Sequence, residues 1–454
     1  MILHLLLISL PIIIFLYFLH KNRNPIKTLV PPGPPGLPLI GNIHQLASVK
    51  TPHVYLWQLS KKYGPLIHMT LGSKQVFVIS SAKLAKQVFK TQDTAFSSRP
   101  KHLGQQTLSY NRFDITFSPY NNYWREVRKI AVINLFSLKK LQSFRPIRED
   151  EMSRLMAKIS GFASSNQAVD LSETTIALGS TLISRIAFGK RYDEHGSEMQ
   201  RFDELELIDE HLSRNKKVDE EEDILDILIQ LKEQKDCSVD LTWDNIKALL
   251  LNIFVAAADT SAVSIVWTMT ALIKAPHVMK KAQAEIRNSI GKKGTVDEDD
   301  LPSLSYLKAL IKESFRMYPP APLLIRETIE KCTLDSYEVQ PKTTVFINSW
   351  AIARDPEYWG DRPHEFLPER FLNSDIDIKG QDFGVVPFGS GRRVCPGMLM
   401  GLANVELTVA NLLYAFDWEL PQGVQAEDVD TEALPGLAVH KKNPLLLVPK
   451  KYVA

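Results

Sequence analysis

Hydrophobic positions divide the chain into an apolar start, a proline-rich stretch and a long body with mostly helical periodicity. The longest apolar pattern in the body begins near Thr242, a suitable N-cap residue, and stops before Pro276. It is apolar on nearly every side, which predicts a helix buried in the middle of the fold. A membrane span is the alternative, but it would place Asp259 near the bilayer centre at a cost of about 2.5–3.5 kcal/mol. We therefore predict a core helix.

Strand-like patterns are few. Residues 66–71 and 75–79 flank a Gly-Ser-Lys turn and predict a β-hairpin. A second β-rich pair covers residues 333–339 and 343–350, with its turn between them. Because no repeat or low-complexity linker follows residue 40, the sequence predicts one large, mainly helical domain with a small β portion.

The apolar start has the features of a membrane anchor. Residues 2–19 are almost wholly apolar, and eighteen helical residues span about 27 Å, close to the thickness of an endoplasmic-reticulum bilayer core. Lys21, Arg23 and Lys27 follow, which places the body in the cytosol. The alternative is a cleaved secretory signal, but the charge stands on the wrong side for one and no small-residue cleavage site follows. We predict an uncleaved anchor at residues 1–20.

The next segment, residues 21–40, joins this basic flank to a Pro-Pro-Gly-Pro-Pro-Gly hexapeptide at 31–36. Prolines restrict the backbone and favour an extended, semi-rigid chain. We predict a stiff hinge between the anchor and the body at residues 41–454, and an irregular proline-rich loop is the alternative.

Composition narrows the class of protein. With 44% apolar and 23% charged residues in 454, the chain can bury a large core and is not mainly disordered. A net charge of +2 is too balanced to indicate nucleic acid as a partner. Three cysteines without C-x-x-C spacing exclude a disulfide scaffold or zinc ribbon and indicate a reducing compartment. A cysteine with a chemical role therefore acts alone.

One cysteine stands in a distinctive setting. A glycine-bearing loop at 387–397 brings Cys395 to a predicted helix start, with Pro396 in the first turn. Free N–H groups, the helix dipole and Arg393 are each expected to lower the pKa of the thiol. Such a thiolate is a nucleophile or a metal ligand, whereas the alternative is an inert buried cysteine.

The pattern Phe-x-x-Gly-x-Arg-x-Cys-x-Gly over residues 388–397 resembles, at every position, the haem-binding signature of the cytochrome P450 monooxygenases. The resemblance extends over almost the whole chain and is nearest to the plant microsomal (A-type) group, which also begins with an anchor and a proline-rich hinge. It implies that Cys395 is the axial thiolate on haem iron, where it donates electron density and favours O–O cleavage. It assigns cofactor contacts in this loop to Phe388, Gly389, Arg393 and Gly397.

Arginines are expected to hold the haem propionates. Trp124 and Arg128 are spaced i,i+4, so on a helix they point the same way, and guanidinium suits bidentate carboxylate binding. The pair matches the family's propionate-binding motif. The resemblance adds Arg393 and Arg326, although the run at 322–326 is one residue shorter than usual. For Arg326 the alternative is an exposed strand charge.

Within the long apolar helix, Asp259 and Thr260 place an acid beside a hydroxyl, and such groups in a core need partners or a function. Threonine can bond the carbonyl four residues earlier and loosen the helix, which makes space for dioxygen and water. The segment resembles the family's oxygen-activation motif, which implies an acid–alcohol proton relay, with Ala257 in place of a usual glycine. The alternative is a polar pair that only satisfies local backbone groups.

Two further charge sets follow from the resemblance. Glu313 and Arg316 share a helix face, and with Arg370 they would form a buried, structural cluster near the haem. Judged alone, the pair would be a surface salt bridge worth under about 1 kcal/mol. A basic face would dock the NADPH-dependent reductase, with a merely solvated face as the alternative. That face comprises Arg125, Lys129, Lys139, Lys140 and Arg392.

The stretch from Phe188 to Asp259 is several tens of residues shorter than in related proteins, and we place the shortening around 200–215. Residues 198–213 and 220–233 each read as one amphipathic helix. The family normally roofs its substrate pocket with two long helices and a loop here. A reduced roof predicts weak substrate binding and poor coupling of NADPH use to product.

Together these observations predict a mainly α protein with a small β portion, the cytochrome P450 fold preceded by one N-terminal transmembrane helix. Its function would be insertion of one oxygen atom from O2 into a small apolar plant secondary metabolite. Electrons would come from NADPH through a reductase at the endoplasmic-reticulum membrane. The rival is a haem-binding but catalytically impaired truncated form. An O2-independent isomerase or dehydratase is disfavoured by the Asp259–Thr260 pair.

Overall fold

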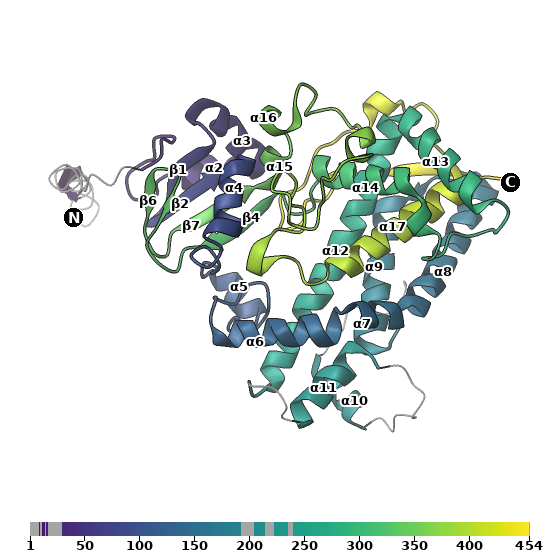
Figure 1. Ribbon diagram of the computed structural model, residues 1–454, viewed down its shortest axis with the longest axis horizontal. Helices are drawn as coiled ribbons and strands as arrows, with labels where there is room; N and C mark the ends of the chain where they lie inside the picture. The colour runs from purple at the N-terminus through teal and green to yellow at the C-terminus, as the bar shows by residue number, and fades with distance from the viewer. Residues whose placement is uncertain are drawn as a thin grey trace.

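The computed structural model describes residues 9, 11–13, 15–16, 30–191, 204–213, 222–234 and 239–453. Helices form most of the body, and the four-stranded sheet lies beside them (Figure 1). Most of the anchor predicted at 1–20, and the basic residues Lys21, Arg23 and Lys27 after it, fall outside the described residues. The described α-helices are α2 (Ile43–Ala47), α3 (Pro52–Tyr63), α4 (Ala82–Lys86), α5 (Leu103–Leu108), α6 (Asn122–Ile130), α7 (Leu138–Ser143), α8 (Arg145–Ser165), α9 (Leu171–Phe188), α10 (Glu204–Ser213), α11 (Ile224–Gln234), α12 (Trp243–Lys274), α13 (Pro276–Ile290), α14 (Ser305–Met317), α15 (Ser349–Ile352), α16 (Pro356–Trp359) and α17 (Met398–Ala415).

The strands of the described chain form three sheets with the orders β1-β2-β7-β4, β3-β9-β8 and β5-β6. Strands β1 and β2 form the predicted hairpin, with Leu71 opposite Lys74 across a two-residue turn. The second β-rich stretch also forms strands, but its two segments do not pair with each other: residues 332–339 form a hairpin by themselves and β7 joins the larger sheet. The bounds are β1 (Leu66–Leu71), β2 (Lys74–Ile79), β3 (Val169–Asp170), β4 (Leu323–Glu327), β5 (Cys332–Leu334), β6 (Tyr337–Val339), β7 (Thr344–Asn348), β8 (Phe416–Glu419) and β9 (Leu446–Lys451).

Helix α12 crosses the middle of the helical part, as the apolar pattern predicts (Figure 1). Thr242 caps it, and Thr242 and Asn245 satisfy each other's backbone N–H groups in a capping box. Among the described residues, α12 and α17 are long and apolar enough to cross a membrane. In α12, however, Leu249 and Met269 are fully buried against neighbouring helices, so the core-helix prediction is confirmed.

The proline-rich segment is docked on the body from its start. Pro31 is buried, and the carbonyl of Pro32 accepts a hydrogen bond of 3.1 Å from the N–H of His68 in β1. The Asn42 amide donates to the carbonyls of Pro34 and Pro35, each at 3.2 Å. Residues 31–36 therefore pack on the surface of the body.

Replacing Gly33 with alanine is expected to destabilise the protein, because an added Cβ would lie 1.9 Å from the carbonyl oxygen of His68. The backbone must separate to admit it, at a cost of about 1–3 kcal/mol, seen as a lower melting temperature. Gly161→Ala in α8 is the control, since nothing lies within 4 Å and removal of a helix glycine stabilises by about 0.5–1 kcal/mol. Equal melting of Gly33→Ala and the parent would show that the segment does not dock.

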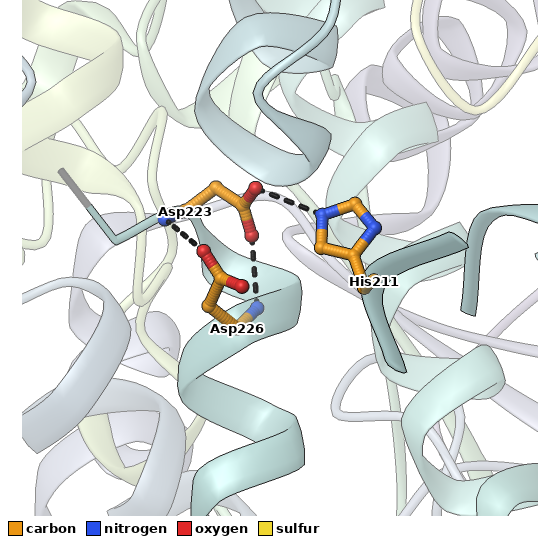
Figure 2. A group of neighbouring side chains, drawn as sticks. All are labelled: His211, Asp223 and Asp226. Carbon is orange, nitrogen blue, oxygen red and sulfur yellow. Dashed lines mark hydrogen bonds and ion pairs between the residues drawn. The ribbon is translucent and has the colours of Figure 1, made fainter. Parts of the chain in front are cut away.

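Helices α10 and α11 form in the two stretches that the amphipathic pattern marks, 198–213 and 220–233, of which residues 198–203 and 220–221 lie outside the described part of the chain. They are joined by a buried ion pair between His211 and Asp223, 2.9 Å from Nε2 to Oδ2 (Figure 2). The backbone N–H groups of Asp223 and Asp226 each bond the other residue's carboxylate. Burial opposes the imidazolium charge, but the hydrogen bond and charge of Asp223 raise the pKa of His211. The pair fastens α10 to α11 beside α12.

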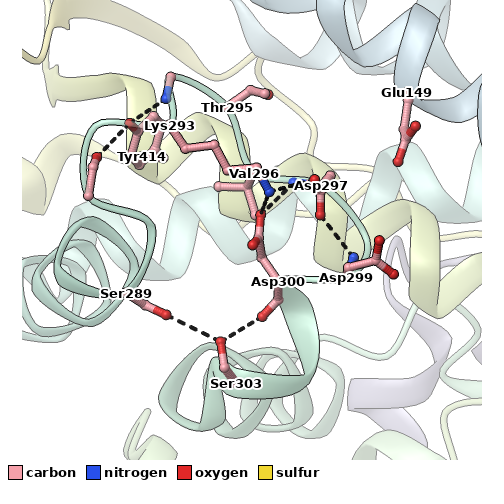
Figure 3. A network of polar contacts seen from close by, with 12 residues as sticks. Glu149, Ser289, Lys293, Thr295, Val296, Asp297, Asp299, Asp300, Ser303 and Tyr414 are labelled. Atoms are coloured by element: carbon pink, nitrogen blue, oxygen red, sulfur yellow. Dashed lines mark hydrogen bonds and ion pairs between the residues drawn. The ribbon is translucent and has the colours of Figure 1, made fainter.

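The far end of α17 is held by the loop that follows α13 (Figure 3). Lys293 pairs with Asp297 at 2.5 Å and with Asp300 at 2.8 Å, which closes this loop on itself. In α17, the Tyr414 hydroxyl donates to the carbonyl of Gly291 at 2.9 Å, and Asn411 donates to the carbonyl of Val296 at 2.8 Å. These contacts fix the axis of α17, and hence the place of the cysteine loop at its start.

Candidate functional site

The cysteine loop is closed by a backbone hydrogen bond and turns at two glycines with positive φ. The N–H of Cys395 donates to the carbonyl of Phe388 at 2.9 Å. Gly389 and Gly391 have φ of +69° and +67°, which favour glycine. A Cβ on Gly391 would lie 2.5 Å from Oδ1 of Asp93. The loop thus packs directly on the segment that carries Asp93.

The thiol of Cys395 lies before the start of α17, and Gly397 is the N-cap residue. Pro396 therefore precedes the N-cap, and its predicted place in the first turn is wrong. Burial raises the pKa of the thiol, whereas the N–H of Gly397 and the charge of Arg128 act in the opposite direction. The predicted lowered pKa is thus wrong for the protein alone. A bound metal ion removes the proton from a coordinating thiol outright, so Cys395 suits a metal better than a free nucleophile.

Four arginines gather around this loop, and three of them were predicted. Arg128 donates to the carbonyl of Val394 at 2.6 Å, and Arg326 donates to that of Ser390 at 3.4 Å. Arg393 donates to the carbonyls of Ser97, Ile115 and Ser118, at 2.7, 3.2 and 2.7 Å. The fourth, Arg99, donates to the carbonyls of Thr116 and Ile325.

The arginine cluster (Arg99, Arg128, Arg326, Arg393) carries more positive charge than its surroundings balance. Burial lowers the pKa of Arg326 well below its ordinary value, and the charges of Arg99 and Arg393 lower it further. Asp114 is buried beside the cluster and Asp93 offsets part of the charge. Buried charges need ionic partners. A cofactor with two carboxylates next to a thiol-bound metal fits this donor set, as haem requires.

Trp124 and Arg326, both predicted to contact the haem propionates, are buried beside the cysteine loop. The indole N–H of Trp124 donates to the carbonyl of Ile115 at 2.9 Å, so it is already satisfied by the protein. Its ring instead lies under the guanidinium of Arg393, 3.8 Å from the ring centroid. Arg326 is buried in β4, so an exposed strand charge is excluded. Sequence reasoning missed Arg99, because no periodicity or motif that we used marks it.

Thr260 and Asp259 occupy adjacent positions near the middle of α12. The Thr260 hydroxyl donates to the carbonyl of Ala256 at 2.8 Å, the i−4 bond that the sequence predicts. The side chain of Asp259 contacts a residue outside α12: its carboxylate lies 2.6 Å from Nε2 of His440, in the loop before β9. Sequence reasoning missed His440, which is 181 positions away along the chain and shows no local signal.

The cluster of Glu313, Arg316 and Arg370 forms as the resemblance implies. Arg316 bonds both carboxylate oxygens of Glu313, at 2.6 and 2.8 Å, and both side chains are completely buried. Arg370 lies 3.7 Å from the same carboxylate. Arg316 also donates to the carbonyls of Ala353 and Pro363. The cluster ties α14 to the segments that precede the cysteine loop, which is a structural task.

His211, Asp223 and Asp226 bring three potential metal ligands within 4.8 Å of one another in the described chain. Nδ1 of His211 faces the carbonyl of Leu207 at 2.7 Å, and Nε2 faces the carboxylate of Asp223. Both partners only accept hydrogen bonds, so both ring nitrogens carry protons. The imidazole has no lone pair for a metal, and the group is an ion pair.

The comparisons with known proteins agree with this geometry. The family model for cytochrome P450 matches residues 31–213 and 205–448. The chain belongs to the cytochrome P450 family. Members bind haem through a cysteine thiolate and use O2 with NADPH-derived electrons that arrive through a reductase. The protein is accordingly a monooxygenase enzyme.

Curated plant P450s are similar over nearly the whole chain. A 6,7,8-trihydroxycoumarin synthase from Pastinaca sativa is 45% identical, over 99% of this chain and 98% of that protein. A 5-OH-xanthotoxin synthase from Ammi majus is 43% identical over 99% and 98%. Cytochrome P450 71B36 from Arabidopsis thaliana is 42% identical over 100% and 99%. This coverage argues against the truncated form that was the rival hypothesis.

A solved structure confirms the P450 fold. A zebra fish cytochrome P450 determined with abiraterone superposes with a TM-score of 0.77 at 25% identity, over 89% of this chain and 100% of that chain.

The comparisons also bear on the length of the chain around residues 205–213, where the two family-model matches overlap. The alignment with the trihydroxycoumarin synthase runs over 502 positions against a chain of 454 residues, so at least 48 positions are gaps in this chain.

Proposed function

We propose that this monooxygenase inserts one oxygen atom from O2 into a small apolar aromatic metabolite of the coumarin class. The observation that carries the proposal is 45% identity over 99% of the chain to a trihydroxycoumarin synthase. Relatives named 5-OH-xanthotoxin synthase follow at 44% and 43%. These names denote hydroxylated products, which is the outcome of single-oxygen insertion.

Within the site, we propose that Cys395 holds the haem iron and that the loop glycines Gly389 and Gly397 let the backbone approach it. Haem bound through a thiolate supplies the electron density that favours O–O cleavage. Support comes from the surplus charge of the arginine cluster, whose guanidinium groups suit two propionates. Trp124 would support Arg393 through its ring, and Phe388 packs against Phe315 with ring centroids 5.2 Å apart.

We propose that Asp259 and Thr260 move protons toward the reacting oxygen. The Thr260 hydroxyl can release its bond to Ala256 and donate elsewhere, because a hydroxyl rotates freely between acceptors. Asp259 is partly exposed, and the structure gives it a titratable partner in His440. General acid catalysis of this kind typically contributes a factor of about 100 to 10,000 in rate.

The partner proposed for electron supply is the NADPH-dependent reductase. Arg125 and Lys139 are exposed, while Lys140 and Arg392 each pair with an acid, at 3.2 Å in both cases. Exposed apolar residues lie between Arg125 and Lys139 along the chain, which suits a docking surface with an apolar centre. They are Val132, Ile133 and Leu138.

We also propose the domain plan and location that the sequence predicts: an anchor at 1–20, a hinge at 21–40 and a cytosolic catalytic body at 41–454. Residues 2–19 and the positive charges after them support single-pass insertion into the endoplasmic reticulum. The overlapping family matches at 205–213 support a shortened roof around 200–215.

The experiment is turnover with a plant reductase in membranes. With NADPH and O2, the protein is expected to convert at least one simple coumarin into a product heavier by one oxygen atom. Omission of NADPH is the control. Failure to convert any coumarin, while an unrelated terpenoid or aldoxime is oxidised, would contradict the substrate class.

Thr260→Ala should retain haem yet divert reducing equivalents to hydrogen peroxide, because proton delivery is impaired.

A further inference from the structure

The carboxylate of Asp259 is paired with a residue from a distant part of the chain. Oδ1 of Asp259 lies 2.6 Å from Nε2 of His440, and both side chains are about one-third exposed. His440 stands in the loop between residues 430 and 445, which precedes β9. Because a carboxylate only accepts hydrogen bonds, Nε2 of His440 carries the proton.

The loop that carries His440 is fixed on both sides of that residue. The N–H of Val439 donates to the carbonyl of Pro320 at 2.9 Å, and its carbonyl accepts a bond of 2.8 Å from the indole of Trp267. On the other side, Lys441 is buried and bonds Asp430 at 2.8 Å. Trp267 belongs to α12, so the same helix that carries Asp259 also anchors the loop. The imidazole is therefore presented by a rigid support, unlike the ends of most surface ion pairs.

The charges around His440 leave Asp259 as its one ionic partner among the described residues. On its own loop, Lys441 is compensated by Asp430, and Lys442 by Glu432. On α12, Asp259 faces the imidazole directly. The hydrogen bond that His440 donates to Asp259 raises the pKa of His440, burial opposes this, and the charge of Asp259 raises it further.

We propose that His440 is a positioning residue for Asp259: it holds the carboxylate in one orientation, and its protonation sets the pH range in which that orientation persists. The proposal rests on the proposed relay role of Asp259 and Thr260. The imidazolium–carboxylate pair exists below the pKa of His440 and is lost as the pH rises through it, because the neutral imidazole can keep its single proton on Nδ1 and then offers Asp259 no donor. Once it is lost, the Asp259 side chain can leave that rotamer.

The contact itself can be measured without turnover. In the full-chain holoprotein, histidine C2-hydrogen exchange followed by mass spectrometry reports the pKa of each histidine. Asp259→Asn is expected to lower the pKa of His440, because it removes the charge that raises it. The exchange of His277, which is exposed on α13, should not change. An unchanged pKa of His440 in Asp259→Asn would overturn the proposal.

The role is tested by the hydrogen peroxide released per NADPH oxidised with reductase, a ratio that needs no identified substrate. His440→Leu removes the donor and should raise this ratio about threefold, while the parent's ratio should rise with pH through the pKa of His440. His440→Gln keeps a donor without the titration, so it should restore a low ratio that no longer depends on pH. His277→Leu is the matched control.

The outcomes separate the two proposals. A parent-like ratio and pH profile in His440→Leu would overturn the role of His440, whatever the substrate proves to be. Absence of coumarin turnover in the parent, with the His440 variants behaving as described, would count against the proposed substrate and leave the positioning role in place.

Discussion

Cys395→Ser should abolish the strongly red-shifted ferrous–CO absorption band that a thiolate ligand produces. Serine is close in size, and the loop is closed by backbone bonds such as the one from the Cys395 N–H to the Phe388 carbonyl, so the fold should persist. The alcohol cannot donate electron density to iron as a thiolate does. The measurement is the reduced CO-difference spectrum, together with total haem content after extraction.

Cys332→Ser is the matched control, because Cys332 is also a free cysteine in the described chain. It lies in β5, and burial together with the charge of Glu330 raises the pKa of its thiol to about 11, so it stays protonated. The control should keep the full thiolate band. A band that survives in Cys395→Ser at full intensity would refute the assignment of the ligand.

Glu313→Gln should cost about 3–5 kcal/mol of the free energy of unfolding, enough to remove much of the folded protein from a cell. The substitution keeps shape but leaves Arg316 buried without its counter-ion, and Arg354 and Arg370 add positive charge nearby. The carbonyls of Ala353 and Pro363 cannot neutralise that charge. Urea denaturation followed by far-ultraviolet circular dichroism measures the loss.

Lys281→Gln is the matched control, because it breaks an ion pair with the same nitrogen–oxygen distance as the Glu313–Arg316 pair. Lys281 and Glu369 are also 2.6 Å apart, but both side chains are exposed to solvent by more than a third. An exposed pair contributes about 0–1 kcal/mol, so this variant should unfold almost like the parent. Similar losses for both variants would mean that burial does not decide the worth of the Glu313–Arg316 pair.

Local pattern was enough to predict the elements that position the site. The capping residue Thr242 and the apolar run after it predicted α12 from end to end, and the turn between residues 71 and 74 predicted the first hairpin. The separate hairpin at 332–339 was not readable, because a strand-like pattern does not say which neighbouring strand each segment pairs with.

The sequence by itself determined the family, and it was enough to propose Cys395 as the ligand and Asp259 with Thr260 as an acid–alcohol pair, since these depend on residue types at short, regular spacing. Only the tertiary structure decided that Arg99 joins the arginine cluster, that the Trp124 indole is satisfied by Ile115, and that burial raises the pKa of the Cys395 thiol. It also decided that His440 meets Asp259. The physical reason is that burial and ionic pairing depend on segments far apart in the chain, which local periodicity does not record.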